Sequence, residues 1–262
     1  MNIKLAKIVL AVLGFAIIIF LSCSDYQSLK FPDRSVACGN RTQPYDEDKY
    51  ECRASTNPNG IYLKAGITDS RDGKHYDAVL IGEQVWMAQN LNYSIPPSSR
   101  CYEATDNGDN AYCNKYGRLY DWVTAMNIAP KYNSDTYTTF GQHTGICPTD
   151  WHIPNDAEWT ALINFVGDNA GTKLKFARSW FEDEDGISGA DDYGFAALPG
   201  GIWNSDNEGD NFLADGLIGM WWSTENSGNV ADNHFMAYND EEVYAGNKYK
   251  DKALLSVRCV KD

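Results

Sequence analysis

The chain has 262 residues and a formal net charge of −14, and 43% of its residues are hydrophobic. This composition suffices for one large domain, or a medium domain with an appendage, and excludes a chain that is disordered throughout. An acidic surface repels phosphate backbones, so we expect no nucleic-acid partner, whereas bound cations, Ca²⁺ first among them, stay open.

Residues 1–22 have the pattern of an export signal. A short basic start precedes an uncharged apolar run over residues 8–21. Spanning a bilayer takes about 20 apolar residues, so this run predicts a signal-peptide core rather than a membrane-spanning helix. Ser22-Cys23 then resembles the bacterial lipoprotein signal, although Phe20 stands where that signal prefers Leu. We expect Cys23 to carry lipid, and an ordinary secretory signal with a chance cysteine is the alternative.

The next segment, residues 23–65, predicts a lipid-anchored tether. It is polar and irregular, and it contains three prolines and an Asn-Pro-Asn-Gly turn at residues 57–60. We expect one small disulfide-stapled element within it, and a globular domain over residues 66–262. No other apolar run is long enough to span a bilayer, so the protein is expected in the bacterial cell envelope, anchored at the outer membrane or cell surface.

Six cysteines remain once Cys23 is set aside: Cys38, Cys52, Cys101, Cys113, Cys147 and Cys259. An even number in an exported chain indicates disulfides, because the compartment is oxidising. Many pairings are open to six cysteines. Nearness in sequence favours Cys38–Cys52 and Cys101–Cys113, which leaves Cys147–Cys259. A structural zinc site is the alternative, but neither C-x-x-C nor H-x₃₋₅-H spacing occurs.

The first elements predicted within the domain are a hairpin and a helix. Residues 76–81 and 84–87 are strand candidates joined by the tight connection Gly82-Glu83. In residues 119–126, apolar side chains recur at i, i+3, i+4 and i+7, which predicts a helix that ends before Pro130.

A second and clearer helix signal follows Pro154. Asn155 can cap the helix, Glu158 completes a capping-box start, and Gly167 ends the apolar stripe. Residues 172–180 predict either a short helix or an extended link. Four strand candidates follow, at residues 195–198, 220–224, 234–238 and 255–260. Two main helices followed by short strands predict an α+β domain with a twisted, mainly antiparallel sheet.

Several phrases of the domain resemble the Fibrobacter succinogenes major paralogous domain (FISUMP) family. They run in order from about residue 66 to the end: residues 69–76, 81–93, 116–122, 147–154, 158–159, 194–201, 221–224 and 256–262. The resemblance implies a C-type-lectin-like fold, a group that also contains formylglycine-generating-type enzymes. It also supports the pair Cys147–Cys259 as a link between an early helix and the last strand, and it implies export or lipid anchoring.

The sequence offers few catalytic groups. His152 could act as a general base, but we expect a packed histidine that donates to backbone, and we expect Glu158 to cap the helix. No G-x-S-x-G, H-E-x-x-H or P-loop pattern occurs. Formylglycine-generating enzymes use reactive thiols, whereas every mature cysteine here has a candidate disulfide partner. We therefore expect no enzymatic activity.

A ligand surface is expected after Gly201, where aromatic rings alternate with amides, carboxylates and glycines and cations are few. Sugars bind to flat aromatic rings and to planar amides and carboxylates. In Trp221-Trp222, strand alternation sends one ring inward and the other to the surface. Packing of these rings in the core is the alternative. The candidate ligand-binding residues are Trp203, Asn204, Asp206, Asn211 and one of Trp221 or Trp222.

Three Asx-rich segments could supply oxygen ligands to a structural Ca²⁺: residues 106–110, 183–192 and 206–210. The same composition suits solvated turns without a metal, and no segment has EF-hand spacing. Calcium-dependent C-type lectins carry Glu-Pro-Asn or Gln-Pro-Asp, which this sequence lacks, and Trp203-Asn204-Ser205 only half resembles their Trp-Asn-Asp. We expect no catalytic cofactor, and structural calcium stays open.

The function expected from the sequence is a non-catalytic binding or adhesion module of the cell envelope, attached to the membrane through its lipid anchor. Its ligand would be a polysaccharide or another surface protein. A formylglycine-generating-type enzyme, which needs a free thiol or a redox metal, is one alternative. A purely structural envelope protein is the other.

Overall fold

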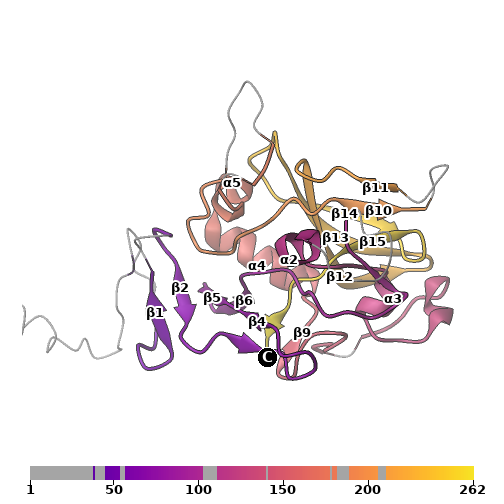
Figure 1. The fold of residues 1–262 in the computed structure, drawn as a ribbon, viewed down its shortest axis with the longest axis horizontal. Helices are drawn as coiled ribbons and strands as arrows, with labels where there is room; N and C mark the ends of the chain where they lie inside the picture. Colours follow the sequence, from indigo (N-terminus) through magenta and orange to yellow (C-terminus); the bar gives the residue numbers. More distant parts are fainter. Residues whose placement is uncertain are drawn as a thin grey trace, which may run out of the picture.

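The structure is a computed structural model, and it describes Cys38 and residues 45–53, 57–102, 111–139, 141–177, 179–181, 189–205 and 211–262. These residues form two large sheets, a two-stranded ribbon and four α-helices (Figure 1). The ribbon pairs β3 (Ile67–Thr68) with β4 (His75–Tyr76). The expected α+β class with mainly antiparallel sheets is confirmed.

The first large sheet has six strands. In spatial order they are β1 (Tyr50–Cys52), β2 (Ile61–Leu63), β5 (Ala78–Ile81), β6 (Gln84–Met87), β16 (Val260–Lys261) and β9 (Trp151–His152). The predicted hairpin is β5–β6, and Gly82 makes its turn at φ 64°, a left-handed conformation that glycine adopts without strain. The strand nearest the end of the chain, β16, lies between β6 and β9.

The second large sheet has eight strands. Six follow one another in space: β11 (Asn211–Leu213), β10 (Ile202–Asn204), β15 (Ala253–Ser256), β12 (Ile218–Ser227), β13 (Val230–Ala237) and β14 (Tyr244–Tyr249). Off this path, β8 (Leu119–Tyr120) pairs with β15 and with β7 (Ser99–Arg100). Within the described strands, only the pair β12–β15 is parallel.

The described helices are α2 (Ala111–Tyr116), α3 (Trp122–Ala125), α4 (Asp156–Val166) and α5 (Ala170–Leu174), with a 3₁₀ turn at η1 (Pro130–Asn133). The predicted helix after Pro154 is α4, and its expected capping box is present, because Asn155 accepts from the Glu158 backbone and Glu158 from that of Asn155. The other expected main helix, over residues 119–126, is shorter than predicted. The start of its apolar stripe lies in strand β8, and only residues 122–125 form a helix, α3.

Some later predictions need correction. Residues 195–198 form no strand, and only an isolated bridge joins Ala197 to Lys175. The strand expected at 255–260 is two strands, β15 and β16, that belong to different sheets. The segment 172–180 divides: α5 covers its start, and its described residues after Leu174 form neither a helix nor a strand. The strand expected at 220–224 lies within β12, and the strand expected at 234–238 overlaps β13, which ends at Ala237.

Two hydrophobic cores lie on opposite faces of β12. Trp222 belongs to one core, together with β5 residue Leu80, and Trp221 belongs to the other, together with Trp159 of α4. Both indole rings are fully buried. The expectation that one ring of this pair reaches the surface is therefore wrong. Alternation along a strand sends neighbouring side chains to opposite faces, but this sheet is covered on both.

Three disulfides join the six described cysteines, and they are the expected pairs Cys38–Cys52, Cys101–Cys113 and Cys147–Cys259. The first of them lies in the segment expected to be a tether. However, β1 and β2 of this segment extend the six-stranded sheet, and Ile61 is buried. Strands β1 and β2 are therefore part of the six-stranded sheet and not of a free tether. Figure 1 shows these two strands at the end of the molecule opposite to β10 and β11.

Two buried cations connect segments that lie far apart in sequence. The Arg258 guanidinium donates to Asn90 Oδ1 and to carbonyl oxygens, and it lies over the Phe195 ring. The Lys250 ammonium lies within 3.0 Å of four acceptor oxygens, two of which belong to residues 226–228, and over the Trp122 ring. Both side chains are fully buried, so these hydrogen bonds replace the water that an exposed cation would bind.

Candidate functional site

The residues expected to bind a ligand do not form an exposed aromatic surface. Trp203 lies on β10 and is 7% exposed, and the rings of Trp221 and Trp222 are buried. Asn204 is half-buried at the end of β10. Two candidates cannot be placed: Asp206 and the side chain of Asn211 lie outside the described residues. The proposed stacking platform of Trp203 with an exposed Trp221 or Trp222 is therefore wrong.

Three other rings are partly exposed beside β10. Tyr102 lies 5.3 Å from Tyr112 and 5.2 Å from Phe212 between ring centroids, with interplanar angles of 48° and 55°. All three rings are half-buried. We refer to Tyr102, Tyr112 and Phe212 as the aromatic cluster. Its members come from three separate segments, so tertiary structure brings them together.

A disulfide positions two of these rings. Tyr102 directly follows Cys101, and Tyr112 directly precedes Cys113 in α2. The bond between the two cysteines therefore holds the two tyrosines side by side. Sequence reasoning missed this pair, although the signal was present. Each cysteine of the expected local disulfide carries a neighbouring tyrosine, and such a bond must bring those tyrosines close.

The third ring is positioned by strand pairing. Phe212 of β11 is the cross-strand partner of Trp203 of β10, and it covers a small core made by Trp203, Leu119 and Leu254. The Arg100 guanidinium lies 4.4 Å from the Trp203 ring centroid. Trp203 thus supports the aromatic cluster from below and does not offer its own face to a ligand. The cluster presents partly exposed rings on a rigid base.

A stacked tyrosine and a lysine border the aromatic cluster on α2. The rings of Tyr112 and Tyr116 stack at 6.2 Å with an interplanar angle of 18°. The Lys115 ammonium donates to the Tyr116 hydroxyl at 2.7 Å. Arg100 and Lys115 therefore place positive charge beside the cluster, in a chain whose net charge is strongly negative.

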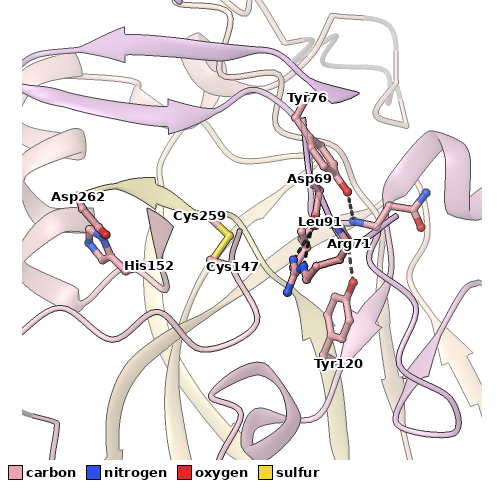
Figure 2. Close-up of a disulfide and its surroundings, with 10 residues drawn as sticks. Asp69, Arg71, Tyr76, Leu91, Tyr120, Cys147, His152, Cys259 and Asp262 are labelled. Carbon is pink, nitrogen blue, oxygen red and sulfur yellow. Dashed lines mark hydrogen bonds and ion pairs between the residues drawn. A yellow bond between two sulfur atoms is a disulfide. The ribbon is translucent and has the colours of Figure 1, made fainter. Parts of the chain in front are cut away.

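His152 is buried and paired with two carboxylates. Its Nε2 donates to Glu158 Oε1 and its Nδ1 to Asp262 Oδ1, both at 2.7 Å. Burial lowers the pKa of His152, but the hydrogen bonds to the two carboxylates outweigh burial, so the pKa is raised. Figure 2 shows His152 beside Asp262, with the Cys147–Cys259 bond between them and the Asp69–Arg71 pair. The His152 ring joins β9, α4 and residue Asp262, and the expected donation to backbone is wrong.

Neither a metal site nor a free thiol is found in the described part of the chain. No three His, Cys, Asp or Glu side chains there are arranged to hold a metal ion. Two of the calcium candidates, residues 106–110 and 206–210, lie outside the described residues, as does most of 183–192. All six described cysteines are in disulfides. Among the helices that the structure describes, none is long and apolar enough to cross a bilayer.

Comparison with known proteins identifies the family. No curated protein and no solved structure matches the chain. The sequence profile of the Fibrobacter succinogenes major domain, however, matches residues 79–261. This span runs from strand β5 to strand β16, so it includes the eight-stranded sheet and four of the six strands of the other large sheet, and it confirms the resemblance seen in the sequence. The chain belongs to the Fibrobacter succinogenes major domain family.

Proposed function

We propose that this protein is a non-catalytic binding module whose aromatic cluster recognises a polysaccharide. The observation that carries the proposal is the gathering of three partly exposed rings, in which Tyr112 and Phe212 each lie within 5.3 Å of Tyr102 between ring centroids. Sugar rings present apolar C–H faces that pack on aromatic rings, and tyrosine hydroxyls add hydrogen bonds at the edge.

The chemical state of the cysteines and of His152 supports a non-catalytic role. A formylglycine-generating-type reaction needs a thiolate, and disulfide bonding removes the thiol of each described cysteine. The one histidine singled out in the sequence, His152, is held between two carboxylates and is 1% exposed. A substrate would have to displace a structural ion pair to reach it.

We further propose that lipid at Cys23 anchors the protein in the bacterial cell envelope, at the outer membrane or cell surface, where it serves in adhesion. Cys23 and residues 1–22 lie outside the described residues, so the sequence pattern alone supports the anchor. Many anchored copies would bind one polysaccharide together, which compensates for a weak single contact.

For the domain itself we propose a C-type-lectin-like fold. Support comes from the family resemblance and from the disulfide Cys147–Cys259, which ties the segment before α4 to the last strands. Structural calcium stays open within this proposal. Its candidate oxygen ligands are the Asx-rich segments at residues 106–110, 183–192 and 206–210.

A polysaccharide screen on the mature protein, with and without calcium, tests the function. Tyr102→Ala and Tyr112→Ala should each weaken binding, because an aromatic contact is worth about 0.5–1.5 kcal/mol beyond the area it buries. Tyr249→Ala is the matched control, since this tyrosine is 45% exposed on the edge strand β14, away from the cluster. Melting temperatures of all three variants show whether the fold is kept.

The possible results separate the proposal from its rivals. If Tyr249→Ala loses as much polysaccharide affinity as the cluster variants, or if both cluster variants bind as tightly as the unaltered protein, the aromatic cluster is not the binding site. If no polysaccharide binds, a pull-down with surface proteins distinguishes a protein ligand from a purely structural role. A free thiol in the mature protein would instead favour the enzyme.

A further inference from the structure

The eight-stranded sheet ends in a long strand, β14, which pairs only with β13 among the described strands. β14 has six residues, whereas the strands at the other ends of the two large sheets, β1, β9 and β11, have two or three. It contains no proline, and its register with β13 runs without a bulge over all six residues. Proteins usually shorten, bend or cover such an edge, because its unpaired backbone groups pair readily with another strand. Nothing in β14 itself prevents such pairing.

The hydrogen bonds to β13 show which backbone groups of β14 face outward. The Lys250 N–H, directly after β14, donates to Asn229 O at 3.0 Å. Bonding alternates along a pair of antiparallel strands, so β14 bonds to β13 through residues 244, 246 and 248. The residues between them direct their backbone N–H and C=O groups away from β13. These outward residues are Ala245, Asn247 and Tyr249.

A second copy of β14, laid antiparallel to the first, matches this pattern. With a two-fold axis at Asn247, residue 247 pairs with residue 247 of the second copy, and residue 245 pairs with residue 249. All outward residues then meet outward residues. Gly246 lies opposite Lys248 of the second copy and leaves room for the lysine stem. The strand is therefore complementary to itself in backbone bonding and in side-chain size.

The charges around β14 favour the antiparallel orientation. Residues 240–242, just before the strand, are Asp-Glu-Glu, whereas residues 248–252 contain three lysines and one aspartate. An antiparallel pair places the acidic segment of each copy beside the lysine-rich segment of the other. A parallel pair would instead place the two acidic segments together, and like charges on neighbouring strands are destabilising. Charge complementarity thus points to a second copy related by a two-fold axis.

We propose that two copies of this protein pair through β14 and join their eight-stranded sheets into one continuous sheet. The interface is isologous, since the same strand serves in both copies. The aromatic cluster does not take part, because β11, which carries Phe212, lies at the opposite end of the sheet order. The proposal is therefore independent of polysaccharide binding.

Sedimentation velocity of the mature protein over a range of concentrations tests the pairing, at about 0.15 M salt to screen the net negative charge. A dimer that increases with concentration is expected. Asn247→Pro removes an outward N–H and no bond to β13, and edge strands tolerate such a proline. Both backbone bonds at the two-fold axis are lost, so the dimer should weaken by about ten- to hundredfold. The matched control Asn247→Ala keeps the N–H and should dimerise like the unaltered protein.

A cysteine at the axis gives a second and independent test. In an antiparallel hydrogen-bonded pair, opposite Cα atoms lie about 5.5 Å apart, which is within the range of disulfides. Asn247→Cys should therefore form a cross-linked dimer on a non-reducing gel. The control is Glu83→Cys, because Glu83 is exposed in the β5–β6 turn of the other large sheet and should give no such dimer.

Four results would overturn the proposal: a monomer at every concentration, undiminished dimerisation of Asn247→Pro, equal loss in Asn247→Ala, or equal cross-linking by the two cysteine variants. A monomer would leave the β14 edge to a strand of another protein. If the melting temperature shows that Asn247→Pro does not fold, the cross-linking result decides.

Discussion

Replacing Arg258 by Met tests how the two cores are held together. The guanidinium is fully buried and donates to Asn90 Oδ1 at 2.6 and 3.1 Å, to Met87 O at 3.1 Å and to Ala196 O at 3.3 Å. It also donates to Phe195 O. Burial lowers the pKa of Arg258 to about 9, so the side chain is still charged at neutral pH. Methionine has a similar length and no donor.

The expected loss in the free energy of unfolding comes from the groups that lose Arg258 as a hydrogen-bond or charge partner. Three carbonyl oxygens become unpaired in the interior, and each unpaired group costs about 1–3 kcal/mol. Asn90 Oδ1 suffers less, because the Trp221 indole N–H also donates to it at 2.8 Å. The carboxyl of Asp191, whose pKa burial raises to about 7, loses a nearby positive charge. These effects overlap, so we expect a loss of about 3–5 kcal/mol, as for other broken buried charge contacts.

Urea denaturation followed by tryptophan fluorescence, with the disulfides intact, measures this loss. The control is Arg53→Met, because the ion pairs of Arg53 with Glu51 and Asp77 are more than one-third exposed and should contribute less than about 1 kcal/mol. If Arg258→Met costs no more than Arg53→Met, the buried hydrogen bonds do not hold the cores together and the reasoning is wrong.

Three further predictions concern pH, the disulfides and the anchor. The raised pKa of His152 stabilises the fold fully below its unfolded value of about 6.5, and this stabilisation is lost as pH rises through the folded value. Urea unfolding between pH 5.5 and 8.5 should therefore show a steeper decline with pH than in His152→Gln, and equal slopes would refute it. Cys259→Ser opens a bond of sequence separation 112 and should cost about 2–5 kcal/mol, more than Cys52→Ser; equal melting temperatures would argue against this. Cys23→Ser should release the protein from the membrane fraction and abolish fatty-acid labelling, and unchanged labelling would exclude the anchor.

The parts of the fold that the sequence predicted are those encoded locally. The helix α4 begins at an Asn155–Glu158 capping box and ends at Gly167, and all of these signals lie within one short segment. The β5–β6 hairpin is similarly determined by its two-residue turn. Such elements need no knowledge of what packs on them.

The predictions that failed depend on tertiary context. Leu119 and Trp122 have helical spacing, but Leu119 pairs with Ser256 in the eight-stranded sheet, so the first part of the stripe is extended. Likewise, Trp221 and Trp222 point to opposite faces as predicted, and only the second core determines that neither is exposed. A single stripe of apolar residues cannot reveal how many layers cover a sheet.

The candidate site was predicted in region but not in residues. Trp203 and Asn204 lie on β10, directly beside β11, which supplies Phe212. However, aromatic composition does not distinguish a ring in the core from one at the surface, and Trp203 belongs to the core. The pairing of Tyr102 with Tyr112 follows from the Cys101–Cys113 bond, because each cysteine has one of these tyrosines as its neighbour in sequence and the bond brings the two rings together.

The position of β16 determines when the domain can form. This strand fills the gap between β6 and β9, yet it is synthesised last of the six. Without residues 260–261 in place, the sheet lacks an inner strand and β9 has no neighbour in it. The six-stranded sheet is therefore completed only by pairing between strands that lie far apart in sequence, and such long-range pairing slows folding.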